Sequence, residues 1–343
     1  MKEELKKRFL AALKEYHSLG IAEQIDYQKF YLYSIITHST AIEGSTVTEI
    51  ENQLLFDEGI TAKGRSLQEQ MMNLDLKAAY EHSMQLAHQH TDFSIDMLKE
   101  LSAIVMKNTG ASYNTAQGSF DASKGDLRLV GVTAGIGGRS YMNYQKVPAK
   151  LAELCQLLNQ RRQTLLNGTD IIEQYLLSFD AHYQLVTIHP WVDGNGRMSR
   201  LVMNHLQYEF GLVPVKIVKE DKAEYIQALV DSREQESLEP FREFMMEEHV
   251  RNICKEIEEY KKSQADDPIK VTPDPIKSFS DPIKDRLYQA VLQDGTLNYA
   301  EYAAIVGASE ATVKRRLGEL KKEGIIIRVG SNKTGHWEVV NRS

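Results

Sequence analysis

The chain contains only two cysteines, Cys155 and Cys254, among its 343 residues. Two cysteines are too few for the disulfide framework of a small secreted domain, and no Cys/His spacing typical of a zinc site is present. Long apolar runs are missing too, which excludes a membrane span, and the first residues lack the apolar segment of a secretory signal. The sequence therefore predicts a cytoplasmic protein without a membrane partner.

A surplus of positive charge is also missing. The formal net charge is −7 at pH 7, and the hydrophobic fraction of 42% is ordinary for a globular protein. A chain with this charge lacks the general electrostatic field that attracts nucleic acids. Its length leaves room for two or three domains with cores of their own.

Residues able to do chemistry are concentrated between positions 189 and 200, in the order His-Pro-Trp-Val-Asp-Gly-Asn-Gly-Arg-Met-Ser-Arg. Residues 170–186 have apolar side chains at helical spacing, and Pro190 predicts that this helix ends near residue 189. Helical spacing returns over residues 198–210. The pattern predicts two helices joined by a turn at residues 193–196.

This turn has the composition of an anion site. Gly194 and Gly196 can adopt positive φ angles, and a glycine turn that opens a helix binds anions through converging backbone N–H groups. Arg197 and Arg200 lie three residues apart, so they share a helical face and can reach the same phosphate chain.

His189 and Asp193 add proton transfer and metal binding to the turn. A neutral histidine can accept a proton from an alcohol near pH 7. A single carboxylate beside a phosphate-binding turn can share Mg²⁺ with a nucleotide, because Mg²⁺ takes few protein ligands. A capped turn between two core helices would explain the glycines and the proline, but not the charged residues beside them. The stretch therefore predicts phosphoryl or nucleotidyl transfer.

The stretch also resembles the signature of the Fic family, His-Pro-Phe-x-Asp/Glu-Gly-Asn-Gly-Arg-x-x-Arg. The single departure is Trp191 in place of phenylalanine, which we expect to alter packing rather than chemistry. The resemblance implies a protein adenylyltransferase, which moves AMP from ATP to a Ser, Thr or Tyr hydroxyl of a protein and releases pyrophosphate. Related kinases of the Doc type depart from the Gly-Asn-Gly segment. Its presence here favours AMP transfer.

On this resemblance, His189 would deprotonate the target hydroxyl and Asp193 would hold the Mg²⁺ ion on the phosphates. The phosphates would be cradled by backbone and side-chain donors of Gly194, Asn195 and Gly196.

Three further residues receive a role in binding ATP. Arg197 would hold the β-phosphate region, as a catalytic and a nucleotide-binding residue, and Arg200 would hold the γ-phosphate. Tyr225 falls where relatives place an aromatic ring against adenine, although a place in a helix core suits it equally well.

A second resemblance lies near the N-terminus. Self-restrained Fic proteins carry Ser/Thr-x-x-x-Glu-Gly/Asn on an inhibitory helix, and Ser39, Glu43 and Gly44 match this pattern. An ordinary helix that ends at a glycine would match it as well. If Glu43 pairs with Arg200, the guanidinium is occupied and a carboxylate stands where phosphate charge must go.

The rest of the catalytic region reads mainly as helices. Their predicted ranges are 2–16, a helix from about residue 22, 48–55, 66–88, 94–106, 147–158 and 223–246. Between residues 113 and 144 the helical period is lost, and residues 127–132 and 140–144 predict a β-hairpin. In Fic relatives a hairpin flap follows Gly-x-x-Arg, as at residues 125–128 here. Such a flap can pair with an extended segment of a target protein, although a mobile surface hairpin would give the same pattern.

The C-terminal part is set apart by proline. Four of the eight prolines lie in residues 268–282, which predicts a linker over residues 263–280. Residues 281–343 then give helix, helix, turn, helix and hairpin, the pattern of a winged helix, with residues 309–317 resembling a recognition helix. This part has ten Lys/Arg and eight Asp/Glu, a net charge of only +2. DNA and protein partners therefore remain equally open.

The predicted fold is mainly α, a Fic-type helical bundle with a small β-hairpin flap and a C-terminal winged helix-turn-helix domain. Its parts are an N-terminal helical region with the inhibitory helix (1–95), the catalytic core (96–262), the linker (263–280) and the winged helix (281–343). We expect an AMP-transferring enzyme restrained by Glu43, with self-AMPylation and a homodimer left open. The alternatives are removal of AMP by the same site, and a DNA-binding regulator whose Fic body senses nucleotide.

Overall fold

The computed structural model describes residues 2–134, 138–265, 281–323, 325–329 and 336–339. The chain divides into two compact units, Met1–Ala265 and Asp266–Ser343. Residues 266–280 of the predicted linker lie outside the described residues, and the boundary proposed between residues 95 and 96 stays a prediction. Among the described helices, none is long and apolar enough to cross a membrane.

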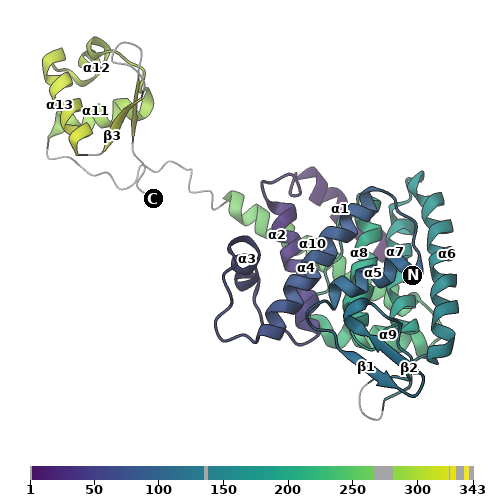
Figure 1. Ribbon diagram of the computed structural model, residues 1–343. Helices are drawn as coiled ribbons and strands as arrows, with labels where there is room; N and C mark the ends of the chain where they lie inside the picture. Colours follow the sequence, from purple (N-terminus) through teal and green to yellow (C-terminus); the bar gives the residue numbers. More distant parts are fainter. Residues whose placement is uncertain (1, 135–137, 266–280, 324, 330–335, 340–343) are drawn as a thin grey trace. The chain divides into compact units, whose positions relative to one another are not determined.

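The larger unit is mainly helical, as predicted (Figure 1). Its helices are α1 (Glu3–Ser18), α2 (Tyr27–Ile42), α3 (Glu49–Glu58), α4 (Leu67–His88), α5 (Ile95–Val105), α6 (Val147–Leu166), α7 (Ile171–Ile188), α8 (Asn195–Glu209), α9 (Lys222–Glu234) and α10 (Glu239–Ala265). At the predicted starts of α3 and α4, capping boxes pair Thr48 with Glu51 and Ser66 with Glu69.

Several predicted helix boundaries are wrong. Helix α6 continues to Leu166, eight residues past the predicted end at residue 158. Helix α2 begins at Tyr27 rather than near residue 22, after Asp26 in a left-handed conformation. Residues 223–246 are not one helix, because α9 ends at Glu234 and the chain turns through Glu236, with φ 50°, before α10. Helix α8 begins at Asn195, three residues before the predicted start, because Gly194 already caps it.

Helices α7 and α8 lie between two hydrophobic cores. In one core, Leu177 and Leu185 of α7 pack against residues of α2, α4, α5 and α6. The other takes Tyr175 and Phe179 from the same helix and packs them with α1, α9 and α10. Because α7 is buried on both sides, the turn that joins it to α8 is held by the whole unit.

The predicted hairpin at residues 127–144 is only partly present. The paired strands are β1 (Ser112–Thr115) and β2 (Gly118–Asp121), which come earlier in the chain. In the described part of residues 127–144, a single antiparallel bridge joins Thr133 and Ser140. The buried guanidinium of Arg128 takes up carbonyl groups at both ends of this segment, so a regular ladder does not form. Residues 135–137, between the two predicted strands, lie outside the described residues.

The smaller unit has the predicted order of elements. They are α11 (Pro282–Gln293), α12 (Tyr299–Val306), α13 (Glu310–Lys322), β3 (Ile326–Val329) and β4 (His336–Val339). The strands β3 and β4 pair antiparallel, and their connection at residues 330–335 lies outside the described residues. Leu287, Tyr302 and Leu317, one from each helix, are fully buried in the core of this unit.

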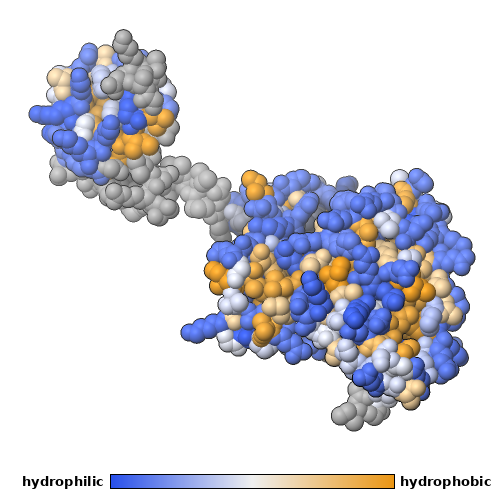
Figure 2. Space-filling view, in the orientation of Figure 1, coloured by the Kyte–Doolittle hydropathy of each residue, from blue (hydrophilic) through white to orange (hydrophobic). Residues whose placement is uncertain are grey.

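The visible face of the larger unit is mostly hydrophilic, with hydrophobic side chains between the polar ones (Figure 2). Among its exposed apolar residues, Ile50 and Leu67 are 73% and 67% exposed. Separate apolar side chains on a surface are normal and imply no partner by themselves.

A buried polar cluster joins α2, α3 and α4 beside the end of α2. Asn73 Oδ1 accepts hydrogen bonds from Thr40 Oγ1 at 2.7 Å and from Asn52 Nδ2 at 2.9 Å. Asn73 Nδ2 in turn donates to Ser45 Oγ at 3.2 Å. Asn52 and Asn73 are fully buried, so these bonds replace hydration that both side chains have lost.

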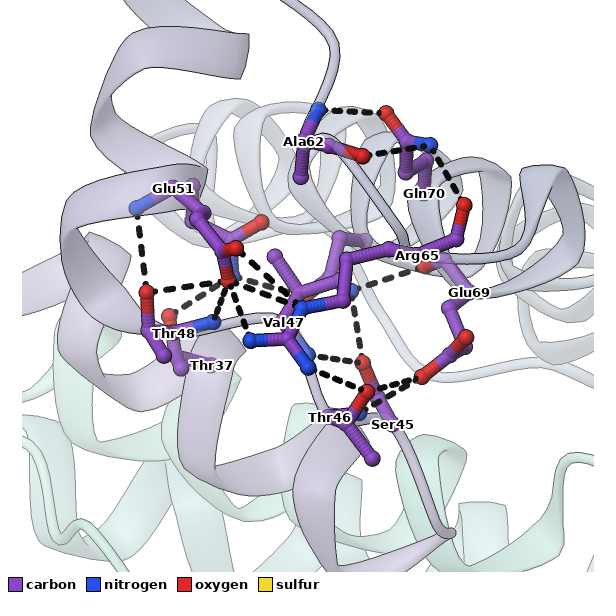
Figure 3. Close-up of polar contacts among 12 residues, drawn as sticks. Thr37, Ser45, Thr46, Val47, Thr48, Glu51, Ala62, Arg65, Glu69 and Gln70 are labelled. Atoms are coloured by element: carbon purple, nitrogen blue, oxygen red, sulfur yellow. Dashed lines mark hydrogen bonds and ion pairs between the residues drawn. The ribbon is translucent and has the colours of Figure 1, made fainter.

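The segment after α2 is held on its outer side as well. Figure 3 shows Arg65 between Glu51 and Thr46, with Nε–Oε2 and Nη1–Oγ1 distances of 3.1 and 3.0 Å. Glu69 Oε1 accepts the backbone N–H of Thr46 at 2.7 Å. The segment after α2 is therefore bonded to Glu69 of α4 directly and to Glu51 of α3 through Arg65.

We expect Asn73→Ala to destabilise the larger unit, because it removes the buried acceptor that Thr40 and Asn52 share and leaves Thr40 only the carbonyls of its own helix and Asn52 only Thr37 Oγ1. The expected loss is about 2 to 4 kcal/mol in the free energy of unfolding, measured by urea unfolding. Gln85→Ala, at an exposed position of the same helix, is the control and should change stability by under about 0.5 kcal/mol. Equal losses in both variants would contradict the role of the cluster.

Candidate active site

The turn between α7 and α8 brings the residues of the 189–200 stretch together. His189 ends α7 in a left-handed conformation, with φ 52° and ψ 63°, and its N–H donates to Leu185 O at 2.9 Å. Gly194, with φ 80°, caps α8. The first N–H groups of α8 have no acceptor within their own helix, so this turn points a set of donors and the positive end of a helix dipole into the site.

Asn195 braces the turn from within. Its Nδ2 donates to Trp191 O at 2.9 Å, and its Oδ1 accepts the N–H of Trp191 at 3.1 Å. The indole N–H of Trp191 donates to Gly125 O at 3.1 Å, and the side chain is fully buried. Both polar atoms of the Asn195 amide are thus engaged with the backbone. One N–H of Nδ2 is used in this bracing, and a contact of Asn195 with phosphate stays a prediction.

Arg197 is buried in the wall of the site, with only 3% of its side chain exposed. Its Nη2 lies 3.2 Å from the sulfur of Met106 and 3.8 Å from Asp193 Oδ1. Among the described residues, its Nε and Nη1 have no hydrogen-bond partner. Leaving such donors buried and unpaired is costly, so this guanidinium is prepared for an anion that approaches from the turn.

Arg200 is held by the helix that precedes it by more than 150 residues in the chain. Its Nε donates to Ser39 Oγ at 2.8 Å, and its Nη2 donates to Ser39 O at 2.9 Å and to Glu43 Oε1 at 2.5 Å. The predicted pairing of Glu43 with Arg200 is therefore present. Gly44 follows with φ 104°, a left-handed value that suits glycine.

The carboxylate of Glu43 covers the start of α8. A Cβ placed on Gly196 would collide with Glu43 Oε1 and approach Arg200 Nη1 to 3.2 Å. Burial raises the pKa of the Glu43 carboxyl, but the charge and hydrogen bond of Arg200 outweigh burial, so the pKa lies below its ordinary value. An ionised carboxylate therefore occupies the anion-binding end of the helix at neutral pH.

His189 is prepared to accept a proton. Burial, with a smaller contribution from the charge of Arg128, lowers the pKa of its imidazole to about 4, although the hydrogen bond with Val186 O opposes the shift. The ring is therefore neutral at pH 7. Its Nδ1 lies 3.4 Å from Val186 O, which favours the proton on Nδ1 and leaves Nε2 as the acceptor.

Arg128 and Tyr141 support His189, although the sequence analysis gave neither of them a role. Arg128 is 1% exposed, and its Nε donates to His189 O at 2.8 Å. The ring of Tyr141 stacks on the imidazole, with 3.7 Å between centroids and 13° between planes. Arg128 stood in the Gly-x-x-Arg pattern, but no spacing pointed to Tyr141, and Met106 appeared only as a helix end.

Asp193 lies at the open side of the turn, and its side chain is 65% exposed. Its Oδ1 accepts the N–H of Gly194 at 2.6 Å, which leaves the second carboxylate oxygen toward solvent. Among the described residues, no group of three or more His, Cys, Asp or Glu side chains gathers as metal ligands. One carboxylate fits Mg²⁺ that is shared with substrate phosphates and water, and does not fit a metal held by the protein alone.

Tyr225 is buried in the core around α9 and α10, with 2% of its surface exposed. Its hydroxyl lies 3.1 Å from His182 Nε2, and burial raises the pKa of this hydroxyl to about 12. The ring packs against Phe241 and Phe244. The structure thus shows the packing role, and a contact with adenine stays a prediction.

Sequence comparison finds a family model that covers the stretch from His189 to Arg200. Residues 92–207 match a family model described as Fic/DOC family, and residues 280–327 match one described as winged helix-turn-helix DNA-binding. The chain is 28% identical over 204 residues to protein adenylyltransferase fic-1 of Caenorhabditis briggsae, covering 59% of this chain and 36% of that protein. It is 31% identical over 215 residues to protein adenylyltransferase Fic of Drosophila erecta, covering 61% and 39%. The chain thus spans less than half the length of these relatives.

Solved structures agree in fold. Fic-1 (aa134 - 508) from C. elegans matches with a TM-score of 0.60 at 22% identity, over 76% of this chain and 73% of that chain. A Fic family protein from Desulfovibrio desulfuricans G20 matches with a TM-score of 0.58 at 18% identity, over 100% and 98%. At these identities the likeness is one of fold.

Proposed function

We propose that this chain, which carries a Fic domain and a C-terminal winged helix-turn-helix domain, transfers AMP from ATP to a hydroxyl group of a protein and releases pyrophosphate. The observation that carries the proposal is a neutral, partly buried His189 beside a turn with free N–H donors and beside Arg197, whose Nε and Nη1 have no hydrogen-bond partner among the described residues. The name of the relatives, protein adenylyltransferase, supports AMP as the transferred group.

In the proposed reaction the target oxygen forms a bond to the α-phosphorus of ATP while the bond from that phosphorus to the bridging oxygen breaks. The hydroxyl proton goes to Nε2 of His189, and pyrophosphate leaves. The first turn of α8 and Arg197 bind the phosphates and offset their charge. Arg200 binds the γ-phosphate when Glu43 has moved away.

Asp193 is the residue that would hold Mg²⁺ in this site. Bound there, Mg²⁺ would offset the charge of the ATP phosphates. The carboxylate is exposed and fixed by Gly194 N, so it is available to a cation that arrives with the nucleotide.

His189→Ala should lose about two to four orders of magnitude in transfer rate, the usual contribution of a general base, while ATP binding stays intact. Transfer is measured with α-phosphate-labelled ATP and the full chain as its own acceptor or with lysate, and ATP binding is measured by calorimetry. His17→Ala, on the exposed side of α1, is the control. Equal labelling in wild type and His189→Ala would overturn the mechanism.

We further propose that Glu43 restrains the enzyme. Its carboxylate occupies Arg200 and the start of α8, so ATP cannot place its γ-phosphate there and the α-phosphorus is left out of line with His189. A water molecule activated by the same carboxylate would instead remove AMP from a target. Transfer remains the main proposal, because an intact base and anion turn serve it directly.

Glu43→Gly should raise AMP transfer by about ten-fold or more, since it frees the γ-phosphate site. Arg200→Ala should stay slow, because it removes both the restraint and the γ-phosphate ligand. The double variant should resemble Arg200→Ala, since both residues act through one interaction. Rates come from the labelled-ATP assay. Flat activity in Glu43→Gly with normal folding and ATP affinity would refute restraint, and a loss of AMP removal from labelled protein would favour the hydrolytic alternative.

For the winged helix we propose binding to DNA. In α13, Lys314 and Arg315 are exposed, whereas Arg316 pairs with Asp281 at 2.5 Å and with Glu319 at 2.8 Å. Arg316 therefore braces the domain, and the two exposed cations remain for phosphate contacts.

The double variant Lys314→Ala/Arg315→Ala should weaken DNA binding of the full chain and lower its salt dependence by about two units in the log–log slope. The measurement is a fluorescence titration with duplex DNA at several salt concentrations. Lys7→Ala/Lys14→Ala, which removes two exposed charges from α1, should leave binding unchanged. If wild type shows no salt-dependent binding, a protein partner takes the place of DNA.

A further inference from the structure

Tyr141 lies directly against the proposed proton acceptor. The two rings are nearly parallel, and the distance of 3.7 Å between centroids is full contact. Tyr141 itself is half-buried and belongs to the segment that leads out of the flap. One face of the His189 imidazole is therefore covered by a side chain that the proposed reaction does not use.

The position of Tyr141 is fixed by its backbone. Its N–H donates to Val132 O at 3.0 Å, and the bridge of Thr133 with Ser140 comes directly before it. Arg128 donates to the carbonyl of Met142 on the other side. Since Arg128 also donates to His189 O, one buried guanidinium joins the backbone that carries the base to the backbone that carries the stacked ring.

The imidazole of His189 has few other restraints. The bond between its Nδ1 and Val186 O is long, at 3.4 Å, and a terminal ring torsion is broad when nothing packs against it. The charged groups that act on the ring are Arg128, Asp193 and Glu43, and the two carboxylates raise its pKa against the larger effect of burial. The ring of Tyr141, stacked on the imidazole of His189, would both hold the imidazole plane and shield it from water.

We propose that Tyr141 is a positioning residue, whose ring holds the plane of the His189 imidazole so that Nε2 faces the target hydroxyl and water stays off the ring. The role follows from the stack and does not need the tyrosine hydroxyl. It rests on the proposed AMP transfer, in which His189 is the proton acceptor. Misplacing a catalytic group by about 1 Å can cost about 100-fold in rate, so a ring that only orients the base has a measurable effect.

The first test does not depend on activity. The pKa of His189 is measured by NMR titration of the full chain, with the His189 signal assigned by its absence in His189→Ala. Tyr141→Ala should raise this pKa by about one unit or more toward the ordinary value near 6.5, because water reaches the ring. Tyr141→Phe keeps the stack and should keep the low pKa, whereas Tyr141→Leu keeps bulk without a ring and should lie between the two.

The second test uses self-modification of the full chain in the Glu43→Gly background. Tyr141→Ala should lower kcat by about ten- to one-hundred-fold with KM for ATP within about two-fold, and Tyr141→Phe should restore most of the rate. Tyr113→Ala is the matched control, since Tyr113 is a half-buried tyrosine that stacks on Phe120 at 5.0 Å in the hairpin of β1 and β2. It should change neither readout, and thermal unfolding checks that each variant is folded.

The outcomes separate this inference from the proposed function. If Tyr141→Ala leaves both the His189 pKa and kcat unchanged, the positioning role is overturned. If Tyr141→Phe is as defective as Tyr141→Ala, the hydroxyl acts instead of the stack, which also overturns it. If no variant transfers AMP but Tyr141→Ala still raises the His189 pKa, the proposed function has failed while the contact itself stands.

Discussion

Two buried guanidiniums at the start of one helix set the main constraint on this protein. Arg197 and Arg200 are each 3% exposed, and both lie in the first turns of α8, where the helix dipole is already positive. So much positive charge away from water requires an anion. Without nucleotide, Glu43 supplies that anion for Arg200, while Nε and Nη1 of Arg197 stay unpaired among the described residues. The same need for negative charge would account both for the proposed phosphate site and for the carboxylate of Glu43 beside Arg200.

A further buried guanidinium, that of Arg128, connects His189 with the predicted flap at residues 127–144. Arg128 donates to the carbonyls of Val130, Met142 and His189, so it takes the place of strand pairing at the root of the flap. Arg128 thus contacts both the backbone of His189 and the segment that carries the ring stacked on its imidazole. In the proposed function, the flap would present a target and His189 would accept its proton. Both are hydrogen-bonded to the same guanidinium, that of Arg128. The geometry of proton transfer then depends on the flap.

The sequence predicted what depends on local chemistry and missed what depends on packing. The 189–200 stretch, the capping boxes at Thr48 and Ser66 and the pairing of Glu43 with Arg200 follow from residue types at short spacing or from a family pattern. The strands β1 and β2 have only four residues each, too few for a periodic signal. Tyr141 contacts His189 across 48 positions, and nothing in the local sequence of either residue indicates the other. The two hydrogen bonds of the Asn195 amide to the backbone of Trp191 were likewise not indicated by the sequence.

If Glu43 restrains the enzyme as proposed, the restraint can be released without moving α2, because the two residues that contact Arg200 are held in different ways. Ser39 lies within α2, where Thr40, the next residue, is tied to Asn73 in a fully buried cluster. Glu43 follows the last residue of α2, and its side chain is 33% exposed. Gly44 comes next, with a positive φ that glycine adopts easily. Removing the carboxylate from Arg200 therefore needs only a rotation of one side chain at a helix end, with α2 left in place. A phosphate group, which carries more charge than a carboxylate and three acceptor oxygens, can then compete for the same guanidinium without any unfolding of the inhibitory helix.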